Sequence, residues 1–183
     1  MKRLVCKRGS VILGPVREGK KEEVKKEEVM RYNQVKDLIA WVEAYHGRLA
    51  SQYSARAAEC ESERLQMVLN YLADHETRMQ AGLRAIFDES HEKREVLETW
   101  FDDPSDFPQP PQLQQLADKP LGDSIDAVMK SAVEAHRTLE ALYRHRVSRA
   151  VIEPEAEFFN ALADGHNAEL RRIVASIEEL QGV

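Results

Sequence analysis

Apolar residues recur along this chain at the three- and four-residue spacing of helices with one buried face. Four such stripes run over residues 35–57, 65–87, 125–150 and 158–180. The first helix is expected to begin near residue 20 and to end at Glu59. Ser62, Ser124 and Pro154 are the residue types that begin helices, and they precede or open the other three stripes. The pattern predicts an all-α chain with four long helices.

The second half of the chain repeats part of the first. Residues 46–74 read again without a gap at 136–164, an offset of 90 positions. The matched pairs include His46 with His136, Tyr53 with Tyr143, Arg56 with Arg146, Asn70 with Asn160 and Asp74 with Asp164. A repeat this long, with two helical stripes in each copy, predicts an antiparallel helix pair that has been duplicated.

A proline-rich stretch joins the two copies. Residues 102–120 contain five prolines and are expected to be extended. About 20 residues in a polyproline-like state reach about 60 Å, and a helix of about 38 residues is about 57 Å long. The connection is therefore long enough to run back along the whole bundle, which favours parallel second and third helices. The alternative is a slack loop between antiparallel helices.

Length and composition predict one domain with an extension. Residues 1–29 are expected to form an arm with a charged helical extension, and residues 30–183 the bundle, divided into a first pair (30–101), a crossover (102–121) and a second pair (122–183). Of the 183 residues, 43% are hydrophobic and 32% charged, which is typical of a helical bundle. The sequence has no apolar run of about 20 residues and only two cysteines. A cytoplasmic protein without a membrane partner is expected.

Charge is divided unevenly along the chain. Residues 1–31 carry ten Lys and Arg against five Asp and Glu, whereas the rest carries sixteen against twenty-seven. Acidic and basic residues alternate in the arm at the spacing of ion pairs on a solvated helix, so nucleic acid is not an expected partner. Bundles of this kind often self-associate, and the charge on the outer faces is compatible with a homodimer.

The repeat places ionisable residues on inward faces. The two hairpins turn near residues 61 and 151, and residues equidistant from a turn face each other. His46 is then level with His75 and Glu76, of which one is expected to face the core, and His136 is level with His166. Glu43 and Glu169 lie one turn away. The candidate metal ligands are His46, Glu76, His136, His166 and Glu169, with Glu43 and His75 in reserve.

Several buried ionisable groups in one layer require compensation, because each unpaired polar group costs a few kcal/mol, on the order of 2–7. A transition metal ion bound by imidazole and carboxylate would provide it; iron is expected, with manganese or zinc as alternatives. The competing hypothesis, from a different class, is a non-catalytic interaction or stress protein whose core contains a His and Glu hydrogen-bond network without metal.

These features resemble the ferritin-like superfamily, which includes bacterioferritins and rubrerythrins. The resemblance covers roughly residues 30–181 and rests on the repeated helix pairs, the long crossover and mid-helix ligands; Glu43 and Glu76 stand at the spacing of that family's first helix pair. It implies a ferritin-like four-helix bundle and a metal-handling or oxidoreductase role. The site it implies is atypical, because Met79 and Val133 stand where the family has His and Glu, and His166 precedes Glu169 in reversed order. The sequence leaves open whether the protein is an enzyme.

Overall fold

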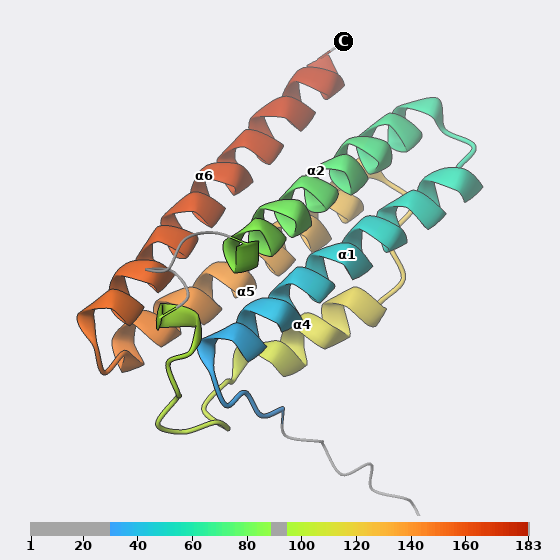
Figure 1. Cartoon of the computed structure of the whole chain (residues 1–183). Coiled ribbons are helices and arrows are strands. Elements are labelled where there is room, and N and C mark those ends of the chain that lie inside the picture. Colours follow the sequence, from blue (N-terminus) through green and yellow to red (C-terminus); the bar gives the residue numbers. More distant parts are fainter. Residues whose placement is uncertain (1–29, 89–94, 183) are drawn as a thin grey trace, which may run out of the picture.

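The computed structural model describes residues 30–88 and 95–182, and these residues form helices joined by short irregular segments (Figure 1). The helices are α1 (Val35–Glu59), α2 (Glu63–Asp88), α4 (Gln109–Asp118), α5 (Ile125–Arg149) and α6 (Glu153–Gly182). Within the described ranges the only β-type pairing is an isolated antiparallel bridge between Gln34 and Trp100. The all-α prediction is confirmed.

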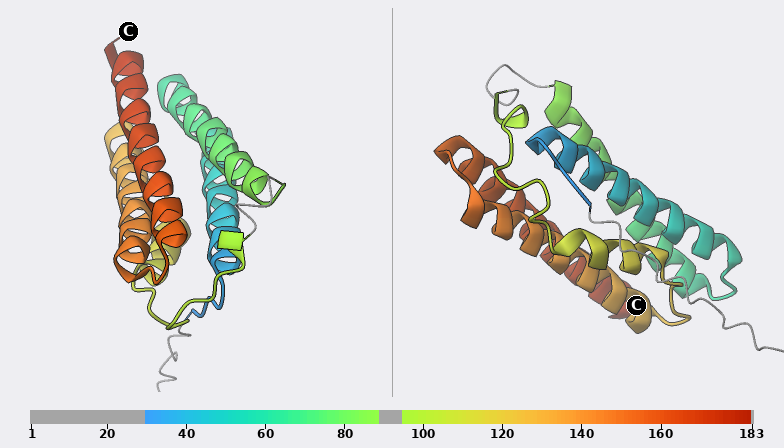
Figure 2. Two further views of the ribbon diagram at one scale, coloured as in Figure 1. Left: turned by 60° about the vertical axis from the view of Figure 1, so that its left-hand side comes forward. Right: turned by 90° about the horizontal axis from the view of Figure 1, so that it is seen from below.

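Four long helices form two antiparallel pairs. α1 packs along α2, and α5 packs along α6. The chain reaches α5 through α4, which contacts both α5 and α1. In Figures 1 and 2, α2 and α5 begin at the same end of the bundle and run in the same direction, while the segment containing α4 returns along its length. In these views the second and third long helices, α2 and α5, are therefore parallel.

The crossover contains a helix, whereas its proline content predicted an extended segment. Residues 109–118 form α4, with prolines in its first turn. The first amide groups of a helix have no intrahelical acceptor, so proline is compatible with these positions. Pro110 and Leu113 are three residues apart and both are buried. The apolar spacing within this segment therefore decided its structure.

The boundaries of the long helices follow local signals. The Ser124 hydroxyl accepts a hydrogen bond from the Ala127 amide at the start of α5, and Pro154 lies in the first turn of α6. The first helix begins later than expected: residues 30–33 are irregular and α1 starts at Val35, where the Gln34 amide donates to the Asp37 carboxylate at 3.0 Å. The predicted arm, 1–29, lies outside the described residues.

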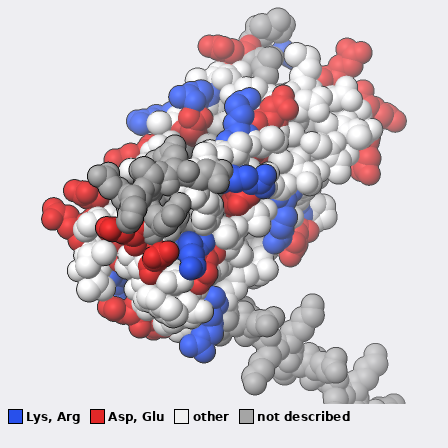
Figure 3. Space-filling view, viewed as in Figure 1, with Lys and Arg blue, Asp and Glu red and all other residues white. Residues whose placement is uncertain are grey.

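The core lies between the two pairs and continues under the crossover. Its fully buried members include Leu38, Leu69, Leu139 and Phe159. On the face seen in Figure 3, described basic side chains are interspersed with acidic ones. None of the described helices combines the length and the hydropathy needed to cross a membrane.

Candidate functional site

Each long helix contributes one residue to a polar layer in the core. The residues are His46 of α1, Glu76 of α2, His136 of α5 and His166 of α6, and none is more than 3% exposed. The Glu76 carboxylate lies between two imidazoles, with Oε2 2.6 Å from Nδ1 of His46 and Oε1 2.8 Å from Nε2 of His136. Nδ1 of His136 is 2.9 Å from Nε2 of His166. The four predicted residues therefore form one continuous hydrogen-bonded network.

The duplication explains how these residues meet. His46 and Glu76 are 30 positions apart, as are His136 and His166. In each hairpin, the histidine of the first helix therefore meets a residue of the second helix at the same distance from the turn. Glu76 and His166 occupy equivalent places in the two copies, 90 positions apart. The network is thus two copies of one pairing, joined through Glu76 and His136.

His75 and Glu76 are both buried, at 2% and 0% exposed, whereas only one of them was expected to face the core. The His75 ring centroid is 5.7 Å from that of His136. Its Nδ1 lies 3.9 Å from a carboxylate oxygen of Glu169, too far for a hydrogen bond. His75 therefore lies beside the network without a hydrogen bond to it.

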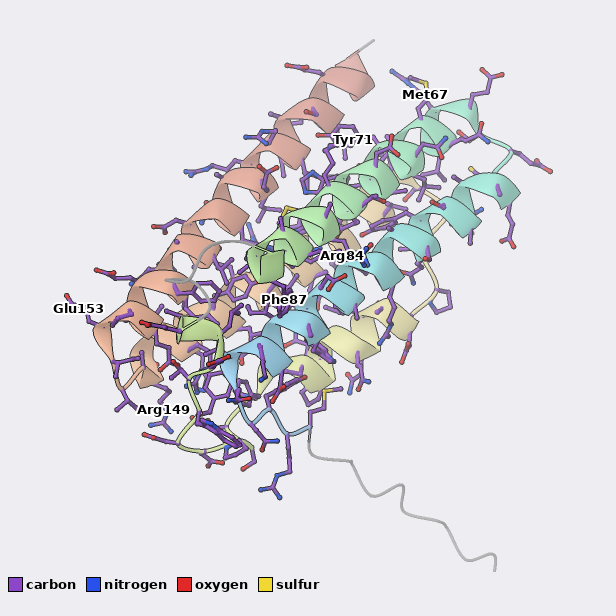
Figure 4. All side chains as sticks on the ribbon, viewed as in Figure 1. Met67, Tyr71, Arg84, Phe87, Arg149 and Glu153 are labelled. Carbon is purple, nitrogen blue, oxygen red and sulfur yellow. The ribbon has the colours of Figure 1, made fainter. Side chains whose placement is uncertain are left out.

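The two remaining candidate ligands, Glu43 and Glu169, are paired with arginine side chains. Glu43 receives two hydrogen bonds from the Arg84 guanidinium, at 2.9 and 2.5 Å, and Arg84 projects from α2 beside α1 (Figure 4). Glu169 accepts from Arg172 on its own helix. The structure therefore places the Glu43 carboxylate away from the histidines and Glu169 at the edge of the layer, near His75.

Burial and mutual contact set the charges in the layer. Burial alone would raise the pKa of Glu76, but contact with His136 and His46 holds that pKa far below its usual range. Burial lowers the pKa of His75 from 6.5 to about 4. Burial, followed by the charges of His136 and His46, places the pKa of His166 well below 6.5. At neutral pH the layer thus holds an ionised Glu76 carboxylate together with neutral rings at His75 and His166.

The carboxylate fixes the direction of the hydrogen bonds when all four rings are neutral. An ionised carboxylate only accepts, so Nδ1–H of His46 and Nε2–H of His136 donate to Glu76. Nδ1 of His136 then accepts from Nε2–H of His166. This arrangement leaves a lone pair on Nε2 of His46. That atom and Nε2 of His75 are both fully buried and have no hydrogen-bond partner among the described residues.

The layer holds ligand-type atoms that contact one another directly. No group of three or more His, Cys, Asp or Glu side chains among the described residues is arranged to hold a metal ion. Ligand atoms around a tetrahedral ion, each about 2.0–2.1 Å from it, stand about 3.3 Å apart. The His46 and His136 contacts with Glu76 are shorter, at 2.6 and 2.8 Å. Holding an ion between these atoms would require them to separate by about 0.5–0.7 Å.

One residue of the layer escaped sequence reasoning. The predicted inward stripe omitted Tyr45, although this residue stands three positions after Val42 and four before Leu49. It is 1% exposed, and its hydroxyl is fully buried without a hydrogen-bond partner among the described residues. Its ring stacks on Trp41 and lies edge-on to His46, with centroids 5.5 and 6.4 Å away. The three- and four-residue spacing from Val42 and Leu49 was the signal that could have found it.

The chain was compared with known proteins, and no family model, curated protein or solved structure matches it.

Proposed function

We propose that this protein binds a transition metal ion, most plausibly iron and otherwise manganese or zinc, within the polar layer of its helical bundle. The observation that carries the proposal is the pair of fully buried imidazole nitrogens without a partner, Nε2 of His46 and Nε2 of His75. Imidazole nitrogen with a free lone pair is a preferred ligand of these ions, and leaving such an atom buried and unpaired costs about 1–3 kcal/mol.

The charge of Glu76 supports the same proposal. Its carboxylate is fully buried, and its partners among the described residues are imidazoles, without a Lys or Arg. An ionised group in such surroundings carries a desolvation cost of several kcal/mol. A divalent cation in the layer would offset that cost, as would a proton on one of the rings.

Glu76 also orients the candidate ligand. A histidine that binds a metal through one ring nitrogen commonly donates its other N–H to a carboxylate, which fixes the tautomer and the ring orientation. The His46 ring has this arrangement, with Nδ1 bonded to Glu76 and Nε2 free. His75 would contribute a second nitrogen, and His136 and His166 further ones once their mutual hydrogen bond opens.

A bound iron or manganese ion would supply Lewis acidity and redox chemistry at this layer. The chain's own residues would hold its geometry: the four helices fix the rings, and Glu76 keeps His46 in one tautomer. The ferritin-like resemblance supports the proposal through the parallel arrangement of α2 and α5 and the long crossover. A metal-handling or oxidoreductase role is the function proposed with it.

Metal content tests the proposal. Plasma mass spectrometry measures the number of metal ions per chain. The samples are natively purified protein and protein loaded with Fe(II), Mn(II) or Zn(II). The His46→Gln/His75→Gln variant should lose the metal, whereas His145→Gln, a matched change at a histidine paired with Asp106, should retain it. Absence of metal from the loaded wild-type chain, or full occupancy in the double variant, would contradict the site.

A second candidate function has one observation in its favour. Three hydrogen bonds of 2.6–2.9 Å already link His46, Glu76, His136 and His166, so the layer could be a structural network in a non-catalytic interaction protein. The melting temperature distinguishes the two functions. Chelation should lower it in a metal-binding protein, because an ion that binds the folded state stabilises that state, whereas a purely structural network predicts no change.

A further inference from the structure

A cavity of about 240 Å³ lies between α2 and α6, on the flank of the histidine layer. Its wall is mainly apolar, with Met79, Leu83 and Ile86 from α2 and Leu162 from α6. The two helices lie side by side in Figures 1 and 2. The cavity is open to solvent on one side, because Gly82 and Gly165, which line it, are exposed. Its volume has room for a compact molecule with one ring.

Two glycines keep the cavity open. Gly82 of α2 and Gly165 of α6 both line it, and a Cβ atom added at either position would meet no atom within 4 Å. Gly165 stands at the position equivalent to His75 in the first copy of the repeat. The second copy therefore has space where the first copy has an imidazole.

The cavity also has a polar group with an unused hydrogen-bonding atom. His166 lines it and is only 3% exposed. Nε2 of this ring is bonded to His136, and Nδ1 has no partner among the described residues. Nδ1 is not among the fully buried atoms that lack a partner, so it retains some accessible surface on a ring that lines the cavity. In the neutral network Nδ1 of His166 carries a lone pair and accepts.

A second polar side chain borders the same space. Tyr143 of α5 lines the cavity, with its ring edge-on to His166 at 5.7 Å between centroids. Burial raises the pKa of Tyr143, so its hydroxyl stays protonated and can donate. That hydroxyl has no hydrogen-bond partner among the described residues either. An occupant that both donates and accepts would use both groups.

We propose that this cavity binds a small molecule with an apolar ring and a single hydroxyl group, which donates to Nδ1 of His166. A hydroxyl is the simplest group that can donate to the imidazole and accept from Tyr143, while the ring fills the apolar wall. The inference goes beyond metal binding and does not depend on it, because Nδ1 of His166 lies on the side of the ring away from the network.

Phenol is the probe, and its dissociation constant is measured by titration calorimetry with the full chain at pH 7.5. Anisole has the same ring without a hydroxyl donor and should bind about tenfold more weakly, the loss of one hydrogen bond worth about 1.4 kcal/mol. Equal binding of the two molecules would overturn the role of His166.

Gly165→Leu should fill the cavity and abolish phenol binding without lowering the melting temperature, since its side chain enters open space. Ala85→Leu is the matched control, because Ala85 is an exposed position of α2 outside the residues that line the cavity. Gly82→Leu provides a second way to fill the space. Phenol binding that survives both glycine changes would overturn the site. Repeating the titration after chelation separates this proposal from the metal proposal, because phenol affinity should stay unchanged.

Discussion

The two hairpins are copies of one sequence, yet their matching residues have different surroundings. Arg56 and Arg146 are equivalent, but Arg56 is paired with an exposed Asp123, whereas Arg146 is 3% exposed and paired with Glu155 at 3.1 Å. The guanidinium of Arg146 also lies over the Phe101 ring, 4.2 Å from its centroid. The crossover segment covers this corner of the second hairpin, and the comparison shows that the neighbouring segment decides what a repeated residue does.

A second difference lies in the polar layer. The position that carries Glu76 in the first copy carries His166 in the second, and His75 corresponds to Gly165. The first hairpin therefore supplies the negative charge and an additional imidazole, while the second supplies two imidazole rings and an open space. These two differences between the repeated segments account for the polarity of the whole network.

The largest expected effect comes from Arg146→Ala. It would leave the carboxylate of Glu155 buried without its guanidinium partner, which typically costs about 3–5 kcal/mol of unfolding free energy. Arg56→Ala, at the equivalent position, should cost about 1 kcal/mol or less, because its partner Asp123 is exposed. Urea denaturation of both variants measures the difference. Similar losses in the two would show that the corners of the hairpins are not distinct.

Replacing the two equivalent residues of the layer should give unequal results. Glu76→Gln replaces one of the two acceptor oxygens by an NH2 donor, so one imidazole N–H loses its acceptor. We expect a loss of about 1–3 kcal/mol together with loss of bound metal. His166→Gln breaks only the hydrogen bond to His136 and should cost about 1 kcal/mol. Denaturation and metal analysis of each variant would check this, and a larger loss for His166→Gln would reverse the assigned polarity.

The pH dependence of stability should reveal His75, which has no counterpart in the second copy. Its pKa falls from 6.5 to about 4 on folding, so between these values the unfolded chain binds more protons than the folded chain. The free energy of unfolding therefore decreases as pH falls from about 6.5 towards about 4, and the lowered pKa of His166 acts in the same direction. Urea denaturation of chelator-treated protein across this range measures it. His75→Gln should have a shallower slope, and an unchanged slope would argue against a neutral buried ring.

The smallest effect is expected at Glu43, whose equivalent in the second copy is Val133. The Glu43→Gln variant should change the unfolding free energy by no more than about 1 kcal/mol, because its partner Arg84 is largely exposed. Metal content should also stay the same, since the carboxylate faces Arg84 rather than the histidines. Loss of metal in this variant would restore Glu43 as a ligand.

Sequence reasoning placed His46, Glu76, His136 and His166 in one layer because helical periodicity and the 90-residue repeat are properties of the chain alone. It could not decide between His75 and Glu76, and both are buried. Two adjacent residues on a helix point about 100° apart, and a helix with neighbours on two sides can bury both. Tyr45 was missed for a different reason: its spacing from Val42 and Leu49 is helical, but it was left out of the predicted stripe.

By itself the sequence determined the four long helices, their pairing into two hairpins and the histidines that face inward, because each follows from the local spacing of apolar residues and from the duplication. The prediction for the proline-rich segment was wrong for residues 109–118. Pro110 and Leu113 are three residues apart and buried, which is compatible with a helix that proline content alone disfavours. Only the tertiary structure decided that Glu76 joins His46 to His136, that Glu43 is directed to Arg84 and that a cavity opens beside His166. These outcomes depend on how far apart the two hairpins lie and how they are rotated, and both are set by contacts between residues distant in the sequence.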